Sequence, residues 1–122
     1  MTTATTPPGL QRTVQVGSRW VATDSEGYLL NLDDWSEDFV RTLACEEGLV
    51  LTPAHWELIA FLRAHFHEHG VQAQVRVMVR HFTRAWGPER GSNHHLHDMF
   101  PVGGPQKQGN RLAGLLRTKG EH

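Results

Sequence analysis

The sequence predicts a mainly helical fold with a small N-terminal β-hairpin. One strand–turn–strand pattern near the start is followed by three segments whose apolar residues recur at helical spacing. The 122 residues, 39% hydrophobic and 20% charged, are enough for one hydrophobic core and too few for two. We therefore expect a single domain over residues 12–116, after a disordered Thr- and Pro-rich tail at 1–11 and before a flexible C-terminal arm at 117–122.

The first elements have clear boundary residues. Residues 12–16 and 19–23 are expected to pair as a hairpin, because glycine in the first place of the two-residue Gly17–Ser18 loop suits a type II′ turn. The first helix is expected to end before Gly48. Carboxylates crowd its start, where they complement the positive end of the helix dipole: Asp33, Asp34, Glu37 and Asp38.

The next two helices are the longest. One begins with Thr52 as the cap and Pro53 at the first helical position, and it ends at Gly70. Its predicted buried stripe is Leu58, Ile59, Leu62 and Phe66. The other ends at Gly87–Pro88, and its apolar face has the clearest helical period in the chain: Val75, Met78, Val79, Phe82, Ala85 and Trp86.

Two shorter helices are expected near the C-terminus. Ser92 can cap one that runs through about Met99. A proline- and glycine-rich passage follows, and then a helical turn over residues 106–115.

Charge and motif content exclude several functions. Twelve Lys and Arg against thirteen Asp and Glu give a formal net charge of -1, so any nucleic-acid surface must be local. No apolar run approaches the roughly 18 residues that span a bilayer, and the N-terminus lacks a signal-peptide pattern, which predicts a cytoplasmic protein without membrane contact. Phosphate-loop, dinucleotide and nucleophile-elbow motifs are absent, so we expect no cofactor and find no enzyme motif.

Three arginines share one face of the third predicted helix. Arg76, Arg80 and Arg84 are spaced by four residues, opposite the apolar face. A solvated surface helix is the first interpretation of this pattern, an acidic protein partner the second and DNA the third. With the preceding helix and the Gly70 corner, the segment is typical of a helix-turn-helix, and DNA binding would then weaken steeply with salt.

Two sets of histidines could offer nitrogen ligands. One set lies one turn apart on the second predicted helix, and the other stands beside an aspartate: His65 and His69, and His94, His95 and His97 with Asp98. Neither has the His-Glu-x-x-His pattern of a metalloprotease. Because His65 and His69 continue the row of Leu58 and Leu62, we expect them at the edge of the core and expect no metal site.

Cys45 is the only cysteine, which excludes an intramolecular disulfide and any site that needs two thiols. Its neighbours Glu46 and Glu47 favour the neutral thiol, so a spectator role is expected more than a reactive one.

Short motifs in a fixed order resemble the DsrC/TusE family over about residues 14–122. They are Glu26–Leu29, Asp34–Trp35, Leu51–Thr52, His55–Glu57, Arg76–Val77, Phe100–Pro101, Lys107–Gln108 and Ala113–Leu115. The resemblance implies a helical domain with an N-terminal hairpin, a helix-turn-helix-like element and a flexible C-terminal arm. It also implies work in dissimilatory sulfur metabolism or in the formation of 2-thiouridine in tRNA.

In that family, a penultimate cysteine on the arm accepts a persulfide sulfur, and the DsrC branch adds an inner cysteine. By this resemblance the two positions fall on Glu121 and Asn110, so both family thiols are replaced. The resemblance therefore implies a redox-inert relative that binds relay proteins, with the segment from Lys107 to His122 occupying the site that a cysteine-bearing relative would enter. The Glu121 carboxylate could mimic a charged persulfide there.

Three functions follow from these observations. The first is a regulatory or accessory partner of sulfur-relay or sulfite-reductase-type proteins, with basic residues as the binding set: Arg76, Arg80, Arg84, Lys107, Arg111, Arg117 and Lys119. The second is a sulfur carrier that uses Cys45 in sulfur oxidation or tRNA thiolation. The third is a DNA-binding regulator that uses the arginine face.

Overall fold

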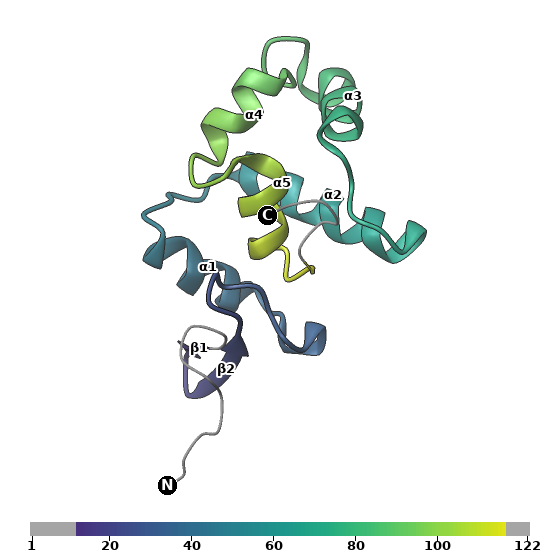
Figure 1. Cartoon of the computed structure of the whole chain (residues 1–122). Helices are drawn as coiled ribbons and strands as arrows, with labels where there is room; N and C mark the ends of the chain where they lie inside the picture. Colours follow the sequence, from purple (N-terminus) through teal and green to yellow (C-terminus); the bar gives the residue numbers. More distant parts are fainter. Residues whose placement is uncertain (1–11, 117–122) are drawn as a thin grey trace, which may run out of the picture.

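The computed structural model describes residues 12–116 and is mainly helical with an N-terminal hairpin, as predicted (Figure 1). The predicted tail at 1–11 and arm at 117–122 lie outside the described residues. The elements are β1 (Arg12–Val16), β2 (Arg19–Thr23), a 3-10 turn η1 (Leu32–Asp34), α1 (Glu37–Glu46), α2 (Pro53–His69), α3 (Val75–Trp86), α4 (Asn93–Met99) and α5 (Gly104–Leu112).

β1 and β2 pair in antiparallel register, with Val14 opposite Val21. These two valines and Val16 are buried, while Trp20 on the other face is 65% exposed. The alternation fixes which face of the hairpin packs on the domain, because neighbouring strand residues point to opposite sides. The two strands have the boundaries that the sequence predicted, residues 12–16 and 19–23.

The start of α1 differs from the prediction. Asp33 and Asp34 lie in the separate η1 turn, and α1 begins only after Ser36, whose side chain accepts a hydrogen bond from the Phe39 N–H. Between the two elements, Trp35 is extended and its indole Nε1 donates to the Leu112 carbonyl at 2.8 Å. This tertiary contact interrupts the helix that the run of carboxylates predicted.

α2 begins and ends where its sequence indicates, with Thr52 as the cap and Gly70 in the left-handed conformation. His55 completes a capping box at the start, since its Nδ1 accepts from the Thr52 N–H at 3.1 Å. Its Nε2 bonds the Met99 carbonyl at 2.7 Å, which ties α2 to the end of α4. The sequence interpretation had given His55 no role.

The connection between α3 and α4 packs so closely on the α3 backbone that only glycine fits at position 91. A Cβ on Gly91 would lie 2.3 Å from the Thr83 nitrogen, which is shorter than any allowed van der Waals contact. Met78 and Phe82 carry the buried face of α3, whereas Ala85, predicted to share that face, is exposed.

The helices enclose one hydrophobic core. Figure 1 shows the hairpin beside α1 at one end, α3 and α4 at the other, and α5 against α2 between them. α5 begins two residues earlier and ends three residues earlier than the predicted 106–115. It ends there because Gly114 is left-handed, at φ +73, and a Cβ on it would lie 2.3 Å from Trp35 Cδ1.

Candidate functional site

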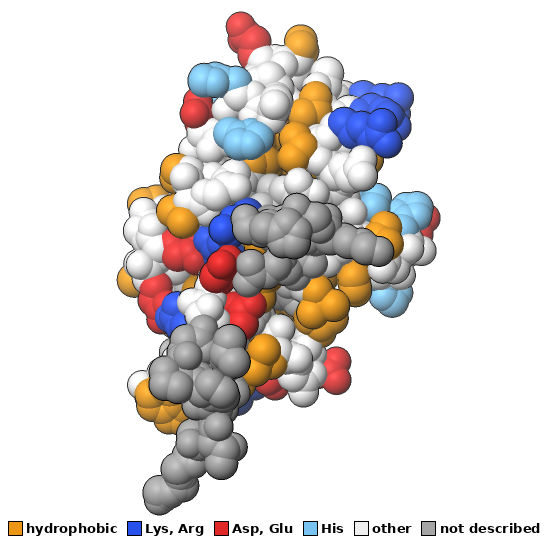
Figure 2. Space-filling view, viewed as in Figure 1, with side chains coloured by type: hydrophobic (Ala, Val, Ile, Leu, Met, Phe, Trp, Pro, Cys, Tyr) orange, Lys and Arg blue, Asp and Glu red, His pale blue; other side chains and the backbone are white. Residues whose placement is uncertain are grey.

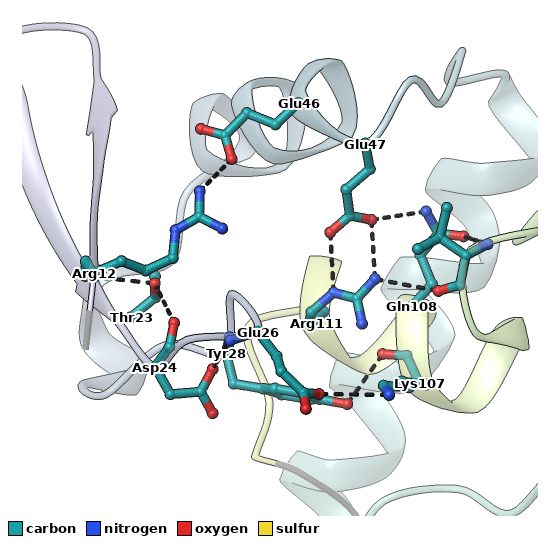
Figure 3. Close-up of polar contacts among 11 residues, drawn as sticks. Arg12, Thr23, Asp24, Glu26, Tyr28, Glu46, Glu47, Lys107, Gln108 and Arg111 are labelled. Carbon is teal, nitrogen blue, oxygen red and sulfur yellow. Dashed lines mark hydrogen bonds and ion pairs between the residues drawn. The ribbon is translucent and has the colours of Figure 1, made fainter. Parts of the chain in front are cut away.

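A buried polar cluster joins the end of α1 to α5 (Figure 3). Arg111 donates to both carboxylate oxygens of Glu47, from Nε and from Nη2, each at 3.0 Å. Gln108 Nε2 donates to the same carboxylate at 2.7 Å. The side chains of Arg111 and Glu47 are only 4% and 14% exposed, so this is a buried, two-pronged ion pair.

The same side chains hold the loop that leads into α5. Gln108 Oε1 accepts from the Val102 N–H at 3.0 Å, and Arg111 Nη2 donates to the Val102 carbonyl at 3.2 Å. On the other side, Tyr28 Oη donates to the Lys107 carbonyl and the Lys107 ammonium pairs with Glu26 at 3.5 Å (Figure 3). The start of the predicted binding segment is therefore built into the domain.

This placement separates the basic residues that the sequence grouped together. Arg111 is 3% exposed and its guanidinium faces Glu47, so it offers no charge at the surface. The predicted partner-binding role of Arg111 needs a guanidinium at the surface, and this one is buried against Glu47. Lys107 is half-buried at the edge of a shallow hollow. Arg117, Lys119 and Glu121 lie outside the described residues.

Asn110 has an unusual environment on the buried side of α5. The residue is 0% exposed, and neither its amide nitrogen nor its amide oxygen has a hydrogen-bond partner within the described part of the chain. Burying a polar group without a partner costs about 1–3 kcal/mol. Asn110 therefore contributes nothing to the network formed by its neighbours Gln108 and Arg111.

Cys45 lies in the last turn of α1 with its side chain exposed. Its backbone carbonyl accepts from the Gly48 N–H at 3.2 Å, so the residue is part of the helix end. The adjacent Glu46 pairs with Arg12 of the hairpin. The Cys45 thiol is exposed to solvent, but the backbone of Cys45 is held in α1, which the Arg12–Glu46 ion pair joins to the hairpin.

The three arginines of α3 are exposed, as the spacing predicted. Arg76 Nε donates to the Gln74 side chain at 3.0 Å. Arg80 and Arg84 have no ion pair or hydrogen bond to another residue in the range 12–116. Figure 2 shows Lys and Arg side chains gathered over α3, with His side chains over the nearby end of α2.

The two histidine sets lie apart. The rings of His65 and His69 on α2 are tilted against each other with centroids 4.4 Å apart, and His65 Nδ1 bonds the Val71 carbonyl at 3.2 Å. On α4, His94 Nε2 is 3.3 Å from Asp98 and His97 Nδ1 bonds the Asn93 carbonyl. Within residues 12–116, no three His, Cys, Asp or Glu side chains are grouped to hold a metal ion.

One cluster escaped the sequence interpretation. Arg63 on α2 lies over the Trp35 ring, 3.7 Å from its centroid, and donates to the Ala113 carbonyl at 2.8 Å. Burial lowers the pKa of the Arg63 guanidinium below its usual value. The available signal was its position four residues after Ile59, on the apolar stripe of α2, where a charge needs partners.

These contacts organise a groove of about 590 Å³ over α1 and α2, which Trp56 and Arg41 also line. Arg41 faces the Trp56 ring at 5.2 Å and pairs with Glu37 and Asp38 on its own helix. The cations of this groove are thus already engaged.

No helix in the described part of the chain combines the length and apolar character that crossing a bilayer requires.

The chain is similar to known sulfur-relay proteins. The family model described as "DsrC like protein" matches residues 15–120. The sulfurtransferase TusE of Yersinia pseudotuberculosis is 40% identical over 97 residues, which are 80% of this chain and 89% of that protein. The sulfurtransferase TusE homologue of Haemophilus influenzae is 40% identical over 95 residues, 78% of this chain and 86% of that one.

Solved structures agree with the family match. DsrC of Allochromatium vinosum superposes with a TM-score of 0.80 and 37% identity, covering 92% of this chain and 99% of that one. The oxidised gamma subunit of the dissimilatory sulfite reductase (DsrC) of Archaeoglobus fulgidus gives a TM-score of 0.83 at 28% identity, with 91% and 100% covered. The resemblance seen in the sequence is confirmed, and the chain belongs to the family of DsrC-like proteins.

Proposed function

We propose that this DsrC-like protein acts in a sulfur relay by binding a relay protein and not by carrying sulfur itself. The observation that carries the proposal is the position of its single cysteine, Cys45, in the last turn of α1. A sulfur carrier must bring a thiolate to the partner's reactive sulfur, which requires both reach and nucleophilicity. A thiol held by a helix lacks the reach of one on a mobile arm.

The electrostatics around Cys45 support the same proposal. Cys45 lies in the last turn of α1, and the last turn of a helix is the negative end of its dipole. A thiolate there would meet like charge. Asn110 and Glu121, at the positions that we match to the family cysteines, cannot accept sulfane sulfur. We place the protein in the cytoplasm, where thiols are kept reduced.

We propose that relay or sulfite-reductase-type proteins are the partners and that the arginine face of α3 takes part in contacting them. Arg80 and Arg84 support this role because they are exposed without a partner among residues 12–116. Lys107, at the rim of the hollow near Glu26, and Arg117 and Lys119 in the arm would extend the contact. Bound in this way, the protein would compete with a cysteine-bearing relative.

The test is intact-mass analysis after incubation with a persulfide-charged sulfurtransferase, with a cysteine-bearing DsrC-like protein as the positive control. We expect the relative to gain one sulfur atom and this chain to gain none. We also expect added chain to slow the loading of the relative. Absence of both binding and competition would overturn the proposal.

A second candidate is sulfur transfer through Cys45, favoured by the exposure of its side chain and by relatives named sulfurtransferases. The Cys45 thiolate would attack the outer sulfur of the partner's persulfide, form a new S–S bond and release the partner's thiolate. Addition of one sulfur atom that disappears in Cys45→Ala would establish this mechanism in place of the first.

A further inference from the structure

A positively charged groove of about 530 Å³ runs between α2 and α3. It is lined from α2 by Phe61, Ala64, His65, Glu68 and His69, and from α3 by Val77, Arg80, His81 and Arg84. Its charged face belongs to the surface where Figure 2 shows arginine and histidine side chains close together.

The charges in the groove are unbalanced. Arg80 and Arg84 have no anionic partner within residues 12–116, and Glu68 is the only carboxylate among the lining residues. Glu68 Oε1 lies 3.7 Å from His69 Nε2 on the same helix, and its single charge is outnumbered by those of the two arginines. The arginines therefore present an unmatched positive potential to whatever enters.

The aromatic rings of the groove contact one another, and one pair is stacked. His81 stacks on Phe61 with centroids 4.3 Å apart, Phe61 lies 6.0 Å from His65, and His65 lies 4.4 Å from His69. Phe61 and His81 also meet Phe82 edge to face. The stacking covers one face of the His81 ring, while guanidinium and imidazole N–H groups remain to donate to an acceptor.

A second hollow continues the groove along α3. It shares His65 and Val77 with the first and adds Arg76 and three amide side chains, Gln72, Gln74 and Gln106. From Arg76 to Arg84 the helix rises about 12 Å, at about 1.5 Å per residue. An extended chain of about four residues spans that length.

We propose that this groove binds a short acidic segment of a protein partner in extended conformation, with its carboxylates on Arg80 and Arg84. The inference rests on the proposed function, because it names the chemistry of the partner. Charge complementarity selects the occupant, since an acidic peptide matches two unpaired guanidinium groups and several N–H donors. A nucleic acid matches less well, because the chain as a whole has a formal net charge of -1 and no general basic field.

Binding of an acidic segment should strengthen as pH falls. His65, His69 and His81 face the groove together with Arg80, Arg84 and Glu68. His65 Nδ1 already bonds the Val71 carbonyl, so protonation adds a donor at its other ring nitrogen. A protonated imidazole is a cation, so its charge would add to that of Arg80 and Arg84.

The experiment is a fluorescence-anisotropy titration of the full chain with a labelled peptide in which Asp or Glu alternates with Gly or Ser. The matched probe carries Asn and Gln in place of the acids. We expect the acidic peptide alone to bind at about 50 mM salt, and more tightly at about pH 6 than at about pH 8. Arg80→Gln and Arg84→Gln should each weaken binding about threefold, and together about tenfold.

The control variants remove the same charge elsewhere. Arg19→Gln, on the exposed face of the hairpin, should leave binding unchanged. His65→Gln/His69→Gln should reduce the pH dependence, whereas His94→Gln/His97→Gln on α4 should preserve it. An equal loss in Arg19→Gln, or no binding at low salt and about pH 6, would overturn the proposal.

An oligonucleotide tested in the same assay distinguishes a nucleic acid from an acidic protein segment as the ligand. Tighter binding of a single-stranded oligonucleotide through Arg80 and Arg84, with a steep salt dependence, would replace the acidic protein segment by nucleic acid. Because the peptide carries no sulfur, a negative result here leaves the mass analysis of sulfur loading intact. A positive peptide result with sulfur loaded on Cys45 would keep the groove and overturn the proposed function.

Discussion

The arginine of α5 and the arginines of α3 carry the same charge in opposite surroundings. The Arg111 side chain is 4% exposed and is bonded twice to Glu47, whereas Arg80 and Arg84 are exposed and unpaired within the described residues. A buried guanidinium beside its carboxylate fastens two helices, and one that faces water stays available to a ligand. Residue type alone therefore does not identify a binding residue.

The largest expected effect comes from removing the partner of the buried arginine. Glu47→Ala leaves the Arg111 charge buried with no carboxylate and also removes the acceptor of Gln108. We expect the free energy of unfolding to fall by about 3–5 kcal/mol in a urea titration. Glu47→Met/Arg111→Met should recover most of that loss. If the double variant is no more stable than Glu47→Ala, the loss of stability does not come from the uncompensated charge of Arg111.

A matched pair of glycines compares the packed and open parts of the chain. Gly114 and Gly70 have the same left-handed φ, +73 and +74, but only at Gly114 would a Cβ meet another group, Trp35. We expect Gly70→Ala to cost about 1 kcal/mol from the backbone alone and Gly114→Ala about 3 kcal/mol, since the collision adds to it. Equal shifts in thermal unfolding would mean that Trp35 moves aside freely.

Asn110 offers a smaller effect of the opposite sign. Asn110→Cys replaces an amide that has no partner among residues 12–116 by a small apolar side chain. Stability should rise by about 1 kcal/mol, measured by urea denaturation with Cys45→Ala as the background. A loss of stability would show that water or another group satisfies the amide in solution.

The smallest effect is expected where charge meets water. Arg80→Gln should change the free energy of unfolding by less than about 0.5 kcal/mol, because the side chain has no partner to lose within residues 12–116. Its acidic-peptide affinity should fall all the same. A loss of stability as large as that of Glu47→Ala would mean that Arg80, like Arg111, stabilises the fold.

Local signals predicted most of the fold. The caps Thr52 and Ser92 and the left-handed Gly70 start or end helices as expected, because these residues satisfy or terminate the backbone hydrogen bonds locally. The prediction was wrong at Asp33 and Asp34, where a bond from Trp35 to the Leu112 carbonyl interrupts the helix. No spacing rule links residues that far apart in the chain.

The candidate site was also predictable only where it depends on local sequence. The spacing of Arg76, Arg80 and Arg84 predicted a solvent-facing row because one helix face is set by period alone. The groove beside it needed α2, whose Phe61 and His65 come from a different segment. Likewise, the pairing of Arg63 with Trp35 joins side chains from two elements.

The sequence by itself determined which segments contain the helices and the hairpin, the family and the presence of a single cysteine, since these depend on periodicity, capping and residue identity. Only the tertiary structure decided which cations are free. Glu47 reaches Arg111 across 64 positions, while no described carboxylate pairs with Arg80 or Arg84. The physical reason is that a side chain's charge is neutralised or left available by its neighbours in space, and packing brings these together.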